Sequence, residues 1–307
     1  MEHSQLSQET ALPSSSSQGH RQDDNDIMAP SRPISDRELV LLSCNVKGST
    51  VRLRALAKAM QGIPRPPDIV ALQDAPKEFP FLIGASKYFF WYNTNRPVLM
   101  EDNPDFKGPR SSNYEELEKL EIDPVGFLIH TSISRAWSVQ QYSNSNQALV
   151  ASLKLQTELG QMCIHNIHNR KCEIKIDELS STCLKGDDLD VFLGDTNLHA
   201  SIWTGEPSGQ ELKAVELADS LLGAGMHCIM TPGVLTYARG LFVSKENCST
   251  IDVIFVGHAL RDRVSESHVV EDWQAFDSDH RPLMCTLSLQ PSREPGRRRR
   301  WDKLSED

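Results

Sequence analysis

The sequence DVFLGDTNLH, from Asp190 to His199, is the stretch from which both the fold and the site can be inferred. Its apolar run at 191–194 is short and lies between polar residues, which is typical of a buried strand. Gly194 permits an unusual backbone angle or a close approach of another segment. The strand would deliver carboxylate, amide and imidazole groups to one sheet edge, where active sites of layered α/β proteins lie. An ordinary turn would explain the polar residues after Gly194 equally well, because Asp and Asn are common turn residues.

Length and composition limit the classes of protein to which this chain can belong. Its 307 residues can bury a large core, and 39% hydrophobic with 24% charged residues is typical of a soluble globular protein. No stretch approaches the roughly 18 apolar residues of a membrane helix, and the N-terminal sequence MEHSQLSQETALPSSSSQGH has no apolar signal core. We therefore expect an intracellular protein that is not secreted and has no membrane partner.

The cysteines and the net charge limit which metals and which macromolecules the chain is expected to bind. Seven cysteines are scattered along the chain and never spaced as Cys-x-x-Cys. This pattern argues against a disulfide framework or a zinc site and favours a reducing compartment. The net charge of −10 speaks weakly against nucleic acid, because non-specific DNA binders carry an excess of Lys and Arg. A DNA partner therefore requires local basic patches or a metal ion to offset the repulsion.

Composition divides the chain into three regions. Residues 1–37 are rich in Ser, Gln, Asp and Pro and are predicted to be a disordered leader. Residues 38–290 contain the apolar runs of one folded domain. Residues 291–307 include GRRRRWDKL and are predicted to be a basic disordered tail. Such a tail is a solvated charge run, a contact to the DNA backbone or, more weakly, a nuclear-import signal.

The first half of the domain begins with a strand, a helix and a second strand. The runs at 38–45 and 68–72 are apolar and β-rich, and the segment 51–60 repeats apolar residues at helical spacing. Segments of strand character follow, and gaps such as SNSN and TELG separate the later ones as in an antiparallel meander. These strands are expected at 88–92, 125–130, 136–141, 148–155 and 161–167, with a long loop or insertion at 93–123.

The second half contains two helical patterns among further strands. The helices are expected at 172–184 and 211–222. The strands are expected at 189–193, 226–230, 234–237, 249–256 and 283–289. The pattern predicts an α/β (α+β) protein in which two packed sheets are flanked by helices.

Polar side chains that can carry chemistry stand at the ends of the expected strands. The positions are Asn45, Asp74, His168, the cluster from Asp195 to His199, and Asp279 with His280. Carboxylates and amides without clustered Cys or His favour a hard cation, Mg²⁺ or Mn²⁺, over zinc. Such an ion, one or two carboxylates and an imidazole are the groups used for phosphodiester cleavage.

Asp252 lies inside an expected strand, STIDVIF, rather than at its end. A charge among apolar neighbours is costly unless it is paired. Asp252 is therefore either a structural cap or the partner of a histidine, and we favour the pairing.

Six blocks of sequence together resemble a known family. They are LLSCNV, DIVALQD, CIHNIHN, FLGDTNLHASIW, STIDVIFV and SDHRPL, and they span about Leu39 to Leu289. Their order is similar to that of the endonuclease/exonuclease/phosphatase superfamily, and most similar to the endonuclease domain of fungal non-LTR (LINE-type) retrotransposons. The resemblance implies a DNase-I-like fold, a four-layer α/β sandwich of two packed mixed β-sheets flanked by helices.

The resemblance also implies roles at the metal and the attacking water. Asn45 matches the asparagine that supports the metal and phosphate site, and Asp74 stands where the family has a metal-binding glutamate. Asp279 matches a carboxylate near the metal. Asp195 matches the aspartate that positions or activates water, and Asn197 matches its phosphate-orienting neighbour.

Further roles concern the phosphate and the substrate groove. His280 matches the histidine that contacts the scissile phosphate, with Asp252 as its orienting carboxylate. His168 matches a position with a role at the leaving group or phosphate. His199 and Trp203 fit the retroelement motif and are expected to shape the substrate groove.

Four positions depart from the family pattern. Asp74 is one methylene shorter than glutamate, so it reaches a metal less well. Thr196 replaces a phenylalanine and removes apolar packing beneath the site. Lys47 stands where some relatives have an acidic residue, and DPVGFLIH lacks an arginine common in the subgroup.

The sequence thus predicts a Mg²⁺-dependent (or Mn²⁺-dependent) DNA endonuclease that nicks target DNA by water attack, in a nuclear protein with no protein partner that can be inferred. Two alternatives remain open. One is a phosphatase or phosphodiesterase for small molecules on the same fold. The other is a non-catalytic remnant, which the changes at Asp74 and Thr196 favour.

Overall fold

The computed structural model describes residues 38–61, 65–76, 89–93, 125–130, 133, 137–145, 148–207, 211–239, 247–270 and 278–290. The leader expected at 1–37, the insertion expected at 93–123 except for its first residue, Asn93, and the basic tail expected at 291–307 lie outside the described residues. Among the helices that are described, none has both the length and the apolar character needed to cross a bilayer.

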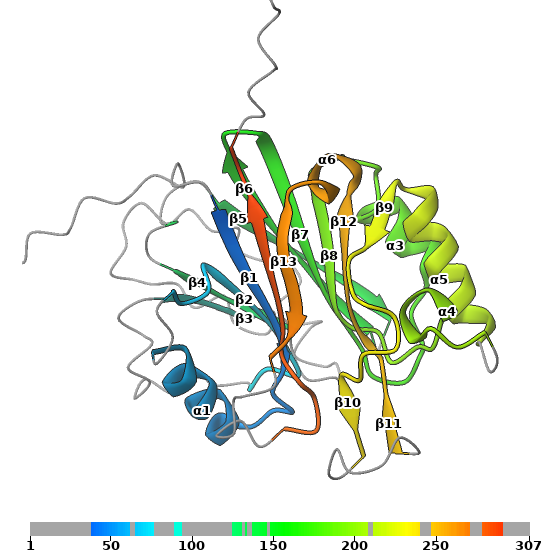
Figure 1. The fold of residues 1–307 in the computed structure, drawn as a ribbon, viewed down its shortest axis with the longest axis horizontal. Coiled ribbons are helices and arrows are strands. Elements are labelled where there is room, and N and C mark those ends of the chain that lie inside the picture. Colours follow the sequence, from blue (N-terminus) through cyan, green and yellow to red (C-terminus); the bar gives the residue numbers. More distant parts are fainter. Residues whose placement is uncertain are drawn as a thin grey trace, which may run out of the picture. The chain divides into compact units, whose positions relative to one another are not determined.

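Two six-stranded mixed sheets form the folded domain (Figure 1). In the first sheet β1 pairs in parallel with β2 and antiparallel with β14, the last strand of the chain. Its order is β13 (Val264–Val269), β14 (Leu283–Ser288), β1 (Glu38–Asn45), β2 (Ile69–Gln73), β4 (Gly126–His130) and β3 (Phe89–Asn93).

The second sheet combines an antiparallel meander with a parallel pair. Strands β5, β6 and β7 pair in sequence order, and β7 then pairs in parallel with β8. Its order is β5 (Trp137–Ser145), β6 (Ala148–Thr157), β7 (Gly160–Asn169), β8 (Asp190–Asp195), β12 (Asp252–Gly257) and β9 (Met226–Cys228). A separate two-stranded ribbon joins β10 (Tyr237–Ala238) to β11 (Cys248–Ser249).

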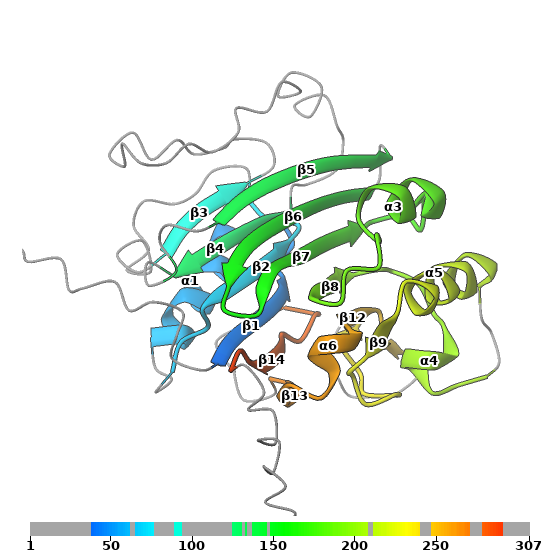
Figure 2. The same ribbon diagram turned by 90° about the horizontal axis from the view of Figure 1, so that it is seen from above.

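Three hydrophobic clusters show that the domain has four layers. The largest lies between the sheets and joins side chains such as Leu41 and Phe127 of the first sheet to Ile164 and Leu193 of the second. Another packs helices against the outer face of the second sheet, and the third packs α1 on the outer face of the first (Figure 2). The helices are α1 (Thr50–Gln61), α3 (Ile176–Thr182), α4 (Ser201–Thr204), α5 (Leu212–Gly223) and α6 (His258–Arg261). The predicted fold class is confirmed.

Strand register brings the polar strand ends together. Asp195, at the end of β8, lies opposite His168 on β7 and opposite Asp252 on β12. Gly194 precedes it with φ +130°, and a Cβ there would lie 2.2 Å from the carbonyl oxygen of Ile167. Only glycine therefore fits, because both the backbone angle and the neighbouring strand exclude a side chain.

Several expected elements differ from those observed. The segment 125–130 does not extend the meander but pairs with β2 and β3 in the other sheet. The strand expected at 249–256 is broken, since β11 ends at Ser249 and β12 begins at Asp252. The helix expected at 172–184 is shorter, and the strand expected at 234–237 is reduced to the start of β10.

Candidate active site

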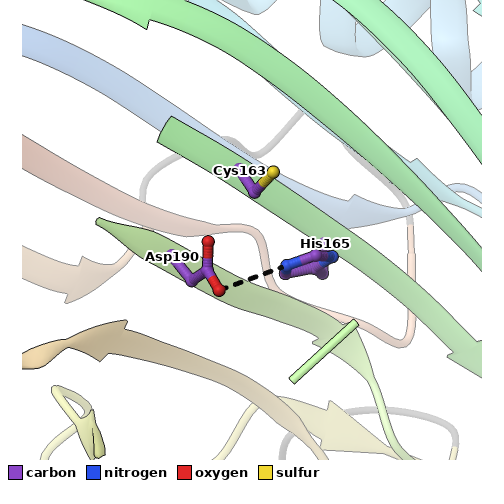
Figure 3. Close-up of side chains that lie close together, drawn as sticks. All are labelled: Cys163, His165 and Asp190. Atoms are coloured by element: carbon purple, nitrogen blue, oxygen red, sulfur yellow. Dashed lines mark ion pairs between the residues drawn. The ribbon is translucent and has the colours of Figure 1, made fainter. Parts of the chain in front are cut away.

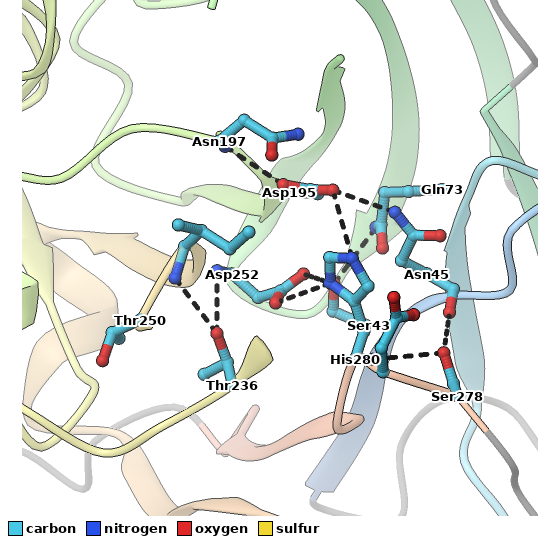
Figure 4. Close-up of polar contacts among 12 residues, drawn as sticks. Ser43, Asn45, Gln73, Asp195, Asn197, Thr236, Thr250, Asp252, Ser278 and His280 are labelled. Atoms are coloured by element: carbon cyan, nitrogen blue, oxygen red, sulfur yellow. Dashed lines mark hydrogen bonds and ion pairs between the residues drawn. The ribbon is translucent and has the colours of Figure 1, made fainter. Parts of the chain in front are cut away.

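The carboxylate of Asp195 is at the centre of a buried polar site. Its side chain is 1% exposed. Its Oδ2 accepts a hydrogen bond from Nδ2 of Asn45 at 2.9 Å, and its Oδ1 accepts one from the backbone N–H of Asn197 at 3.0 Å (Figure 4). Asn45 comes from the first sheet and Asp195 from the second, so this contact exists only when the two sheets are packed.

His280 lies between two carboxylates. Its Nδ1 is 3.0 Å and 3.1 Å from the two oxygens of Asp252, and its Nε2 is 3.8 Å from Oδ2 of Asp195. The three side chains are almost fully buried. The predicted pairing of Asp252 with a histidine is confirmed by these distances.

Burial and mutual attraction set the protonation of these groups. Burial alone would lower the pKa of His280, but Asp252 and Asp195 outweigh it, and the pKa of His280 is raised. Burial raises the pKa of Asp195, and Asp252 adds to that rise, while His280, His168 and the hydrogen bond from Asn45 oppose it. The arrangement therefore favours a proton on His280, which presents an imidazolium beside the Asp195 carboxylate.

Two hydroxyl groups hold this arrangement in place. The buried Oγ1 of Thr236 accepts hydrogen bonds from the backbone N–H groups of Ile251 and Asp252, each at 3.1 Å. Ser278 Oγ donates to the carbonyl oxygen of Asn45 and accepts from the N–H of His280, each at 3.2 Å (Figure 4). Ser278 thereby ties the loop that carries His280 to the end of β1.

His168 and Tyr237 complete the surroundings. His168 is buried on β7 with its Nε2 4.0 Å from Oδ2 of Asp195, so the structure places it with the other predicted residues. The ring of Tyr237 packs at 4.8 Å from the imidazole of His280. Sequence reasoning missed Thr236 and Tyr237, because no spacing relates them to the charged residues they support, and it gave no role to Ser278 although Ser278 directly precedes Asp279 and His280.

Lys47 brings a positive charge among the predicted metal ligands. Its ammonium pairs with the carboxylate of Asp279 and lies 5.8 Å from the ring of Tyr237. Burial lowers the pKa of Lys47, Arg52 lowers it further, and Asp74 and Asp195 raise it, leaving it lowered overall. The ammonium is thus within electrostatic reach of Asp74, Asp195 and Asp279.

The donor atoms at this site suit a hard divalent cation. Carboxylate oxygens of Asp195 and Asp252 lie within 4.8 Å of one another. Oδ1 of Asp279 is buried and has no hydrogen-bond partner among the residues that the structure describes. Carboxylate oxygens of this kind are what Mg²⁺ and Mn²⁺ prefer. Lys47 is the one feature that does not fit, because its ammonium competes for the same carboxylate.

The structure places the remaining predicted residues, Trp203, Asn197 and His199, in different surroundings. Trp203 is 0% exposed, donates from Nε1 to the carbonyl oxygen of Leu198 at 3.0 Å and packs edge-on against Phe255. Trp203 was predicted to shape the substrate groove. Its ring is fully buried in the core and cannot contact a substrate, so this prediction is wrong. Asn197 and His199 are half-buried in the loop after β8.

Thr196, which stands where relatives have a phenylalanine, has a structural role. Its Oγ1 donates to the carbonyl oxygen of Ile251 at 2.8 Å, and its own carbonyl oxygen accepts from Nδ2 of Asn169 at 2.7 Å. The hydroxyl is fully buried. A hydrogen bond to the segment before β12 thus takes the place of apolar packing.

A buried amide network joins the sheets beneath the site. Gln73 donates from Nε2 to Oδ1 of Asn166 at 2.7 Å, and Asn166 donates to the carbonyl oxygens of Leu72 and Gly126, each at 3.0 Å. Asn166 is fully buried. Its place in the alternating block CIHNIHN was the available signal, since an amide on an apolar strand requires buried partners.

Comparisons with known proteins agree with this geometry. Residues 162–284 match the family model described as "Endonuclease-reverse transcriptase". The matched stretch contains Asp195, Asp252 and His280, three of the residues that form the buried polar site. No curated protein is significantly similar in sequence.

Solved structures share the DNase-I-like fold of this chain at low sequence identity. The endonuclease domain of TRAS1, a telomere-specific non-LTR retrotransposon, is 15% identical with a TM-score of 0.52, covering 83% of this chain and 100% of that one. The AP endonuclease LMAP of Leishmania major is 12% identical with a TM-score of 0.56, covering 83% and 89%. TDP2 of D. rerio, complexed with a single-stranded DNA product, is 14% identical with a TM-score of 0.52, covering 81% and 98%.

Proposed function

We propose that this protein is a metal-dependent phosphodiesterase, and specifically a DNA endonuclease of the retrotransposon type. One observation carries the proposal: Asp195 is held by Asn45 from the opposite sheet and faces His280, which Asp252 orients. A carboxylate and an imidazolium at this separation can act on the attacking and the charged oxygens of one phosphate.

Each residue would have a distinct task in hydrolysis. Asp195 orients a water molecule and accepts its proton as the oxygen attacks phosphorus. His280 donates a hydrogen bond to a non-bridging phosphate oxygen as negative charge develops, and Asp252 keeps its ring in place. His168 lies beside them, near the leaving oxygen. A divalent cation held by Asp74 and Asp279, with Asn45 nearby, would supply charge neutralisation at the phosphate.

DNA is the substrate that the observations favour over a small phosphate ester. The family model matched is that of an endonuclease joined to reverse transcriptase, and the TRAS1 domain aligns over its full length. The run RRRR at 297–300 supplies a basic segment that an otherwise acidic chain needs to approach DNA. These features also favour a nuclear location and a catalytic domain spanning 38–290.

A panel of substrates tests this proposal. Supercoiled plasmid, a linear duplex with an abasic site and an inositol phosphate are incubated with the full chain in Mg²⁺ and, separately, in Mn²⁺. We expect conversion of plasmid to nicked circles and little phosphate release from the inositol compound. The reverse ranking would replace the endonuclease by a small-molecule phosphatase.

Lys47 gives the non-catalytic alternative its specific support. An ammonium that pairs with Asp279 neutralises the acidic group without a metal. If no substrate is cleaved while DNA is still bound, the protein is a binding remnant rather than an enzyme.

A further inference from the structure

A second cluster of metal-binding side chains lies elsewhere on β7 and β8. Cys163 on β7 lies directly opposite Asp190 on β8, and His165 is two residues further along β7 on the same face. One ligand atom from each lies within 4.8 Å of the others (Figure 3).

This cluster is separate from the active site. Side chains alternate between the two faces of a strand, so Cys163 and His165 lie on the opposite face of β7 from His168. Asp190 and Asp195 likewise lie on opposite faces of β8. The core contacts agree, because the cluster's face packs against α3 while the other face packs between the sheets.

His165 is oriented as a metal-binding histidine is. Its Nδ1 lies 2.6 Å from Oγ of Ser152, which fixes the ring. Its Nε2 is buried, points toward Asp190 and has no hydrogen-bond partner among the described residues. A ligating histidine commonly bonds a hydroxyl, carbonyl or carboxylate with the ring nitrogen that does not face the metal.

The distance between His165 and Asp190 is informative. Nε2 of His165 lies 3.9 Å from Oδ2 of Asp190. This is too long for a hydrogen bond. It is shorter than the sum of two zinc–ligand bonds of about 2.1 Å each. One ion between the two atoms would therefore satisfy both without moving the strands.

The types of donor atom indicate which metal would bind. The cluster offers a thiol sulfur, an imidazole nitrogen and a carboxylate oxygen. These are zinc ligands, whereas Mg²⁺ takes oxygen ligands.

We infer that Cys163, His165 and Asp190 form a structural zinc site that links β7 to β8. No short sequence motif joins the ligands of these two strands. This site is independent of the proposed nuclease activity and would be occupied whether or not the protein cleaves DNA.

Cobalt titration of the reduced, EDTA-treated full chain tests the inference. We expect one equivalent of Co²⁺ to give the strong visible absorption of a tetrahedral thiolate site, and Zn²⁺ to displace it. His165→Gln and Cys163→Ala should lose this spectrum. His258→Gln and Cys248→Ala, which change a histidine and a cysteine outside the cluster, should keep it, as should Asp195→Asn. A thiolate spectrum that persists in His165→Gln would overturn the site.

X-ray absorption at the zinc edge of the wild-type chain keeps the inference testable if a variant does not fold. One sulfur neighbour, together with nitrogen and oxygen neighbours, is expected. No bound zinc, or a zinc shell without sulfur, would refute the site.

Discussion

At the scale of single residues, Lys47 places a positive charge inside the acidic site. It stands where some relatives carry a carboxylate, and its ammonium pairs with Asp279 near Asp74 and Asp195. The site therefore contains an internal cation with which a bound divalent ion would compete.

Lys47→Met should bind Mn²⁺ about fivefold more tightly than the wild type, since a partly exposed charge contact of this kind is worth about 1 kcal/mol. Isothermal titration calorimetry on the full chain measures the change. Lys58→Met, on the exposed side of α1, is the matched control and should leave the affinity unchanged. Equal affinities for Lys47→Met and the wild type would contradict the competition.

Thr196 shows how a departure from a family can be compensated. Thr196→Val removes the hydroxyl that donates to Ile251, and the expected loss of unfolding free energy is about 1 kcal/mol. Thr196→Phe restores the residue of relatives, but it should cost more, about 1–3 kcal/mol, because the pocket is filled. Urea denaturation ranks the two. A Thr196→Phe protein more stable than the wild type would mean that the structure still has room for a phenylalanine ring at this position.

At the scale of elements, Gly194 allows β8 to lie close to the backbone of β7 at Ile167. Gly194→Ala should lower the unfolding free energy by at least about 1 kcal/mol, because φ is +130° and the new Cβ would meet the carbonyl oxygen of Ile167. Gly223→Ala, in α5 with open space around it, is the control and should stabilise by about 0.4–1 kcal/mol. Thermal denaturation of both variants gives the comparison, and a neutral Gly194→Ala would contradict the steric argument.

The end of β4 should contribute a pH-dependent stability. Burial lowers the pKa of His130 from 6.5, and Asp68 only partly opposes this. The unfolded chain therefore binds the proton more tightly, so stability present above pH 6.5 is lost as pH falls through the folded-state pKa. His130→Gln should flatten this part of the stability curve measured by urea denaturation. An unchanged slope would rule out His130 as its source.

Sequence patterns located the elements with apolar cores but not those at the edges. β1, β2 and β8 were predicted because they are buried on both faces and read as continuous apolar runs. β13 was missed, because the edge strand VSESHV is polar and Val269 is its one buried residue. The break at Thr250 was missed as well; there the side chain of Thr250 donates a hydrogen bond to the carbonyl oxygen of Val234, a contact that the sequence pattern does not reveal.

Sequence patterns identify the residues that carry chemistry better than they predict the direction in which each side chain points. The resemblance brought Asn45, Asp195, Asp252 and His280 together, and the structure does the same. Trp203 follows the same motif yet points into the core, because helix α4 turns its ring away from the site. Cys163 and Asp190 are distant in sequence, and only strand register makes them neighbours.

At the scale of the whole molecule, the site exists only through the packing of two sheets. Asn45 belongs to the first sheet and His280 to the loop that enters it, while Asp195 and Asp252 belong to the second. Any loss of sheet packing should therefore abolish the site before it unfolds the strands. The net charge of −10 further implies that DNA engagement depends on the bound cation and on the basic run at 297–300.

The most direct test of the central claim is the rate at which supercoiled plasmid is nicked in Mg²⁺ by the wild type and by Asp195→Asn. The account predicts nicking by the wild type, its arrest by EDTA, and a loss of about a hundredfold or more in Asp195→Asn. Asp219→Asn, an exposed change on α5, should nick at the wild-type rate. Plasmid that stays intact across Mg²⁺ and Mn²⁺ titrations, or equal rates for Asp195→Asn and the wild type, would contradict it.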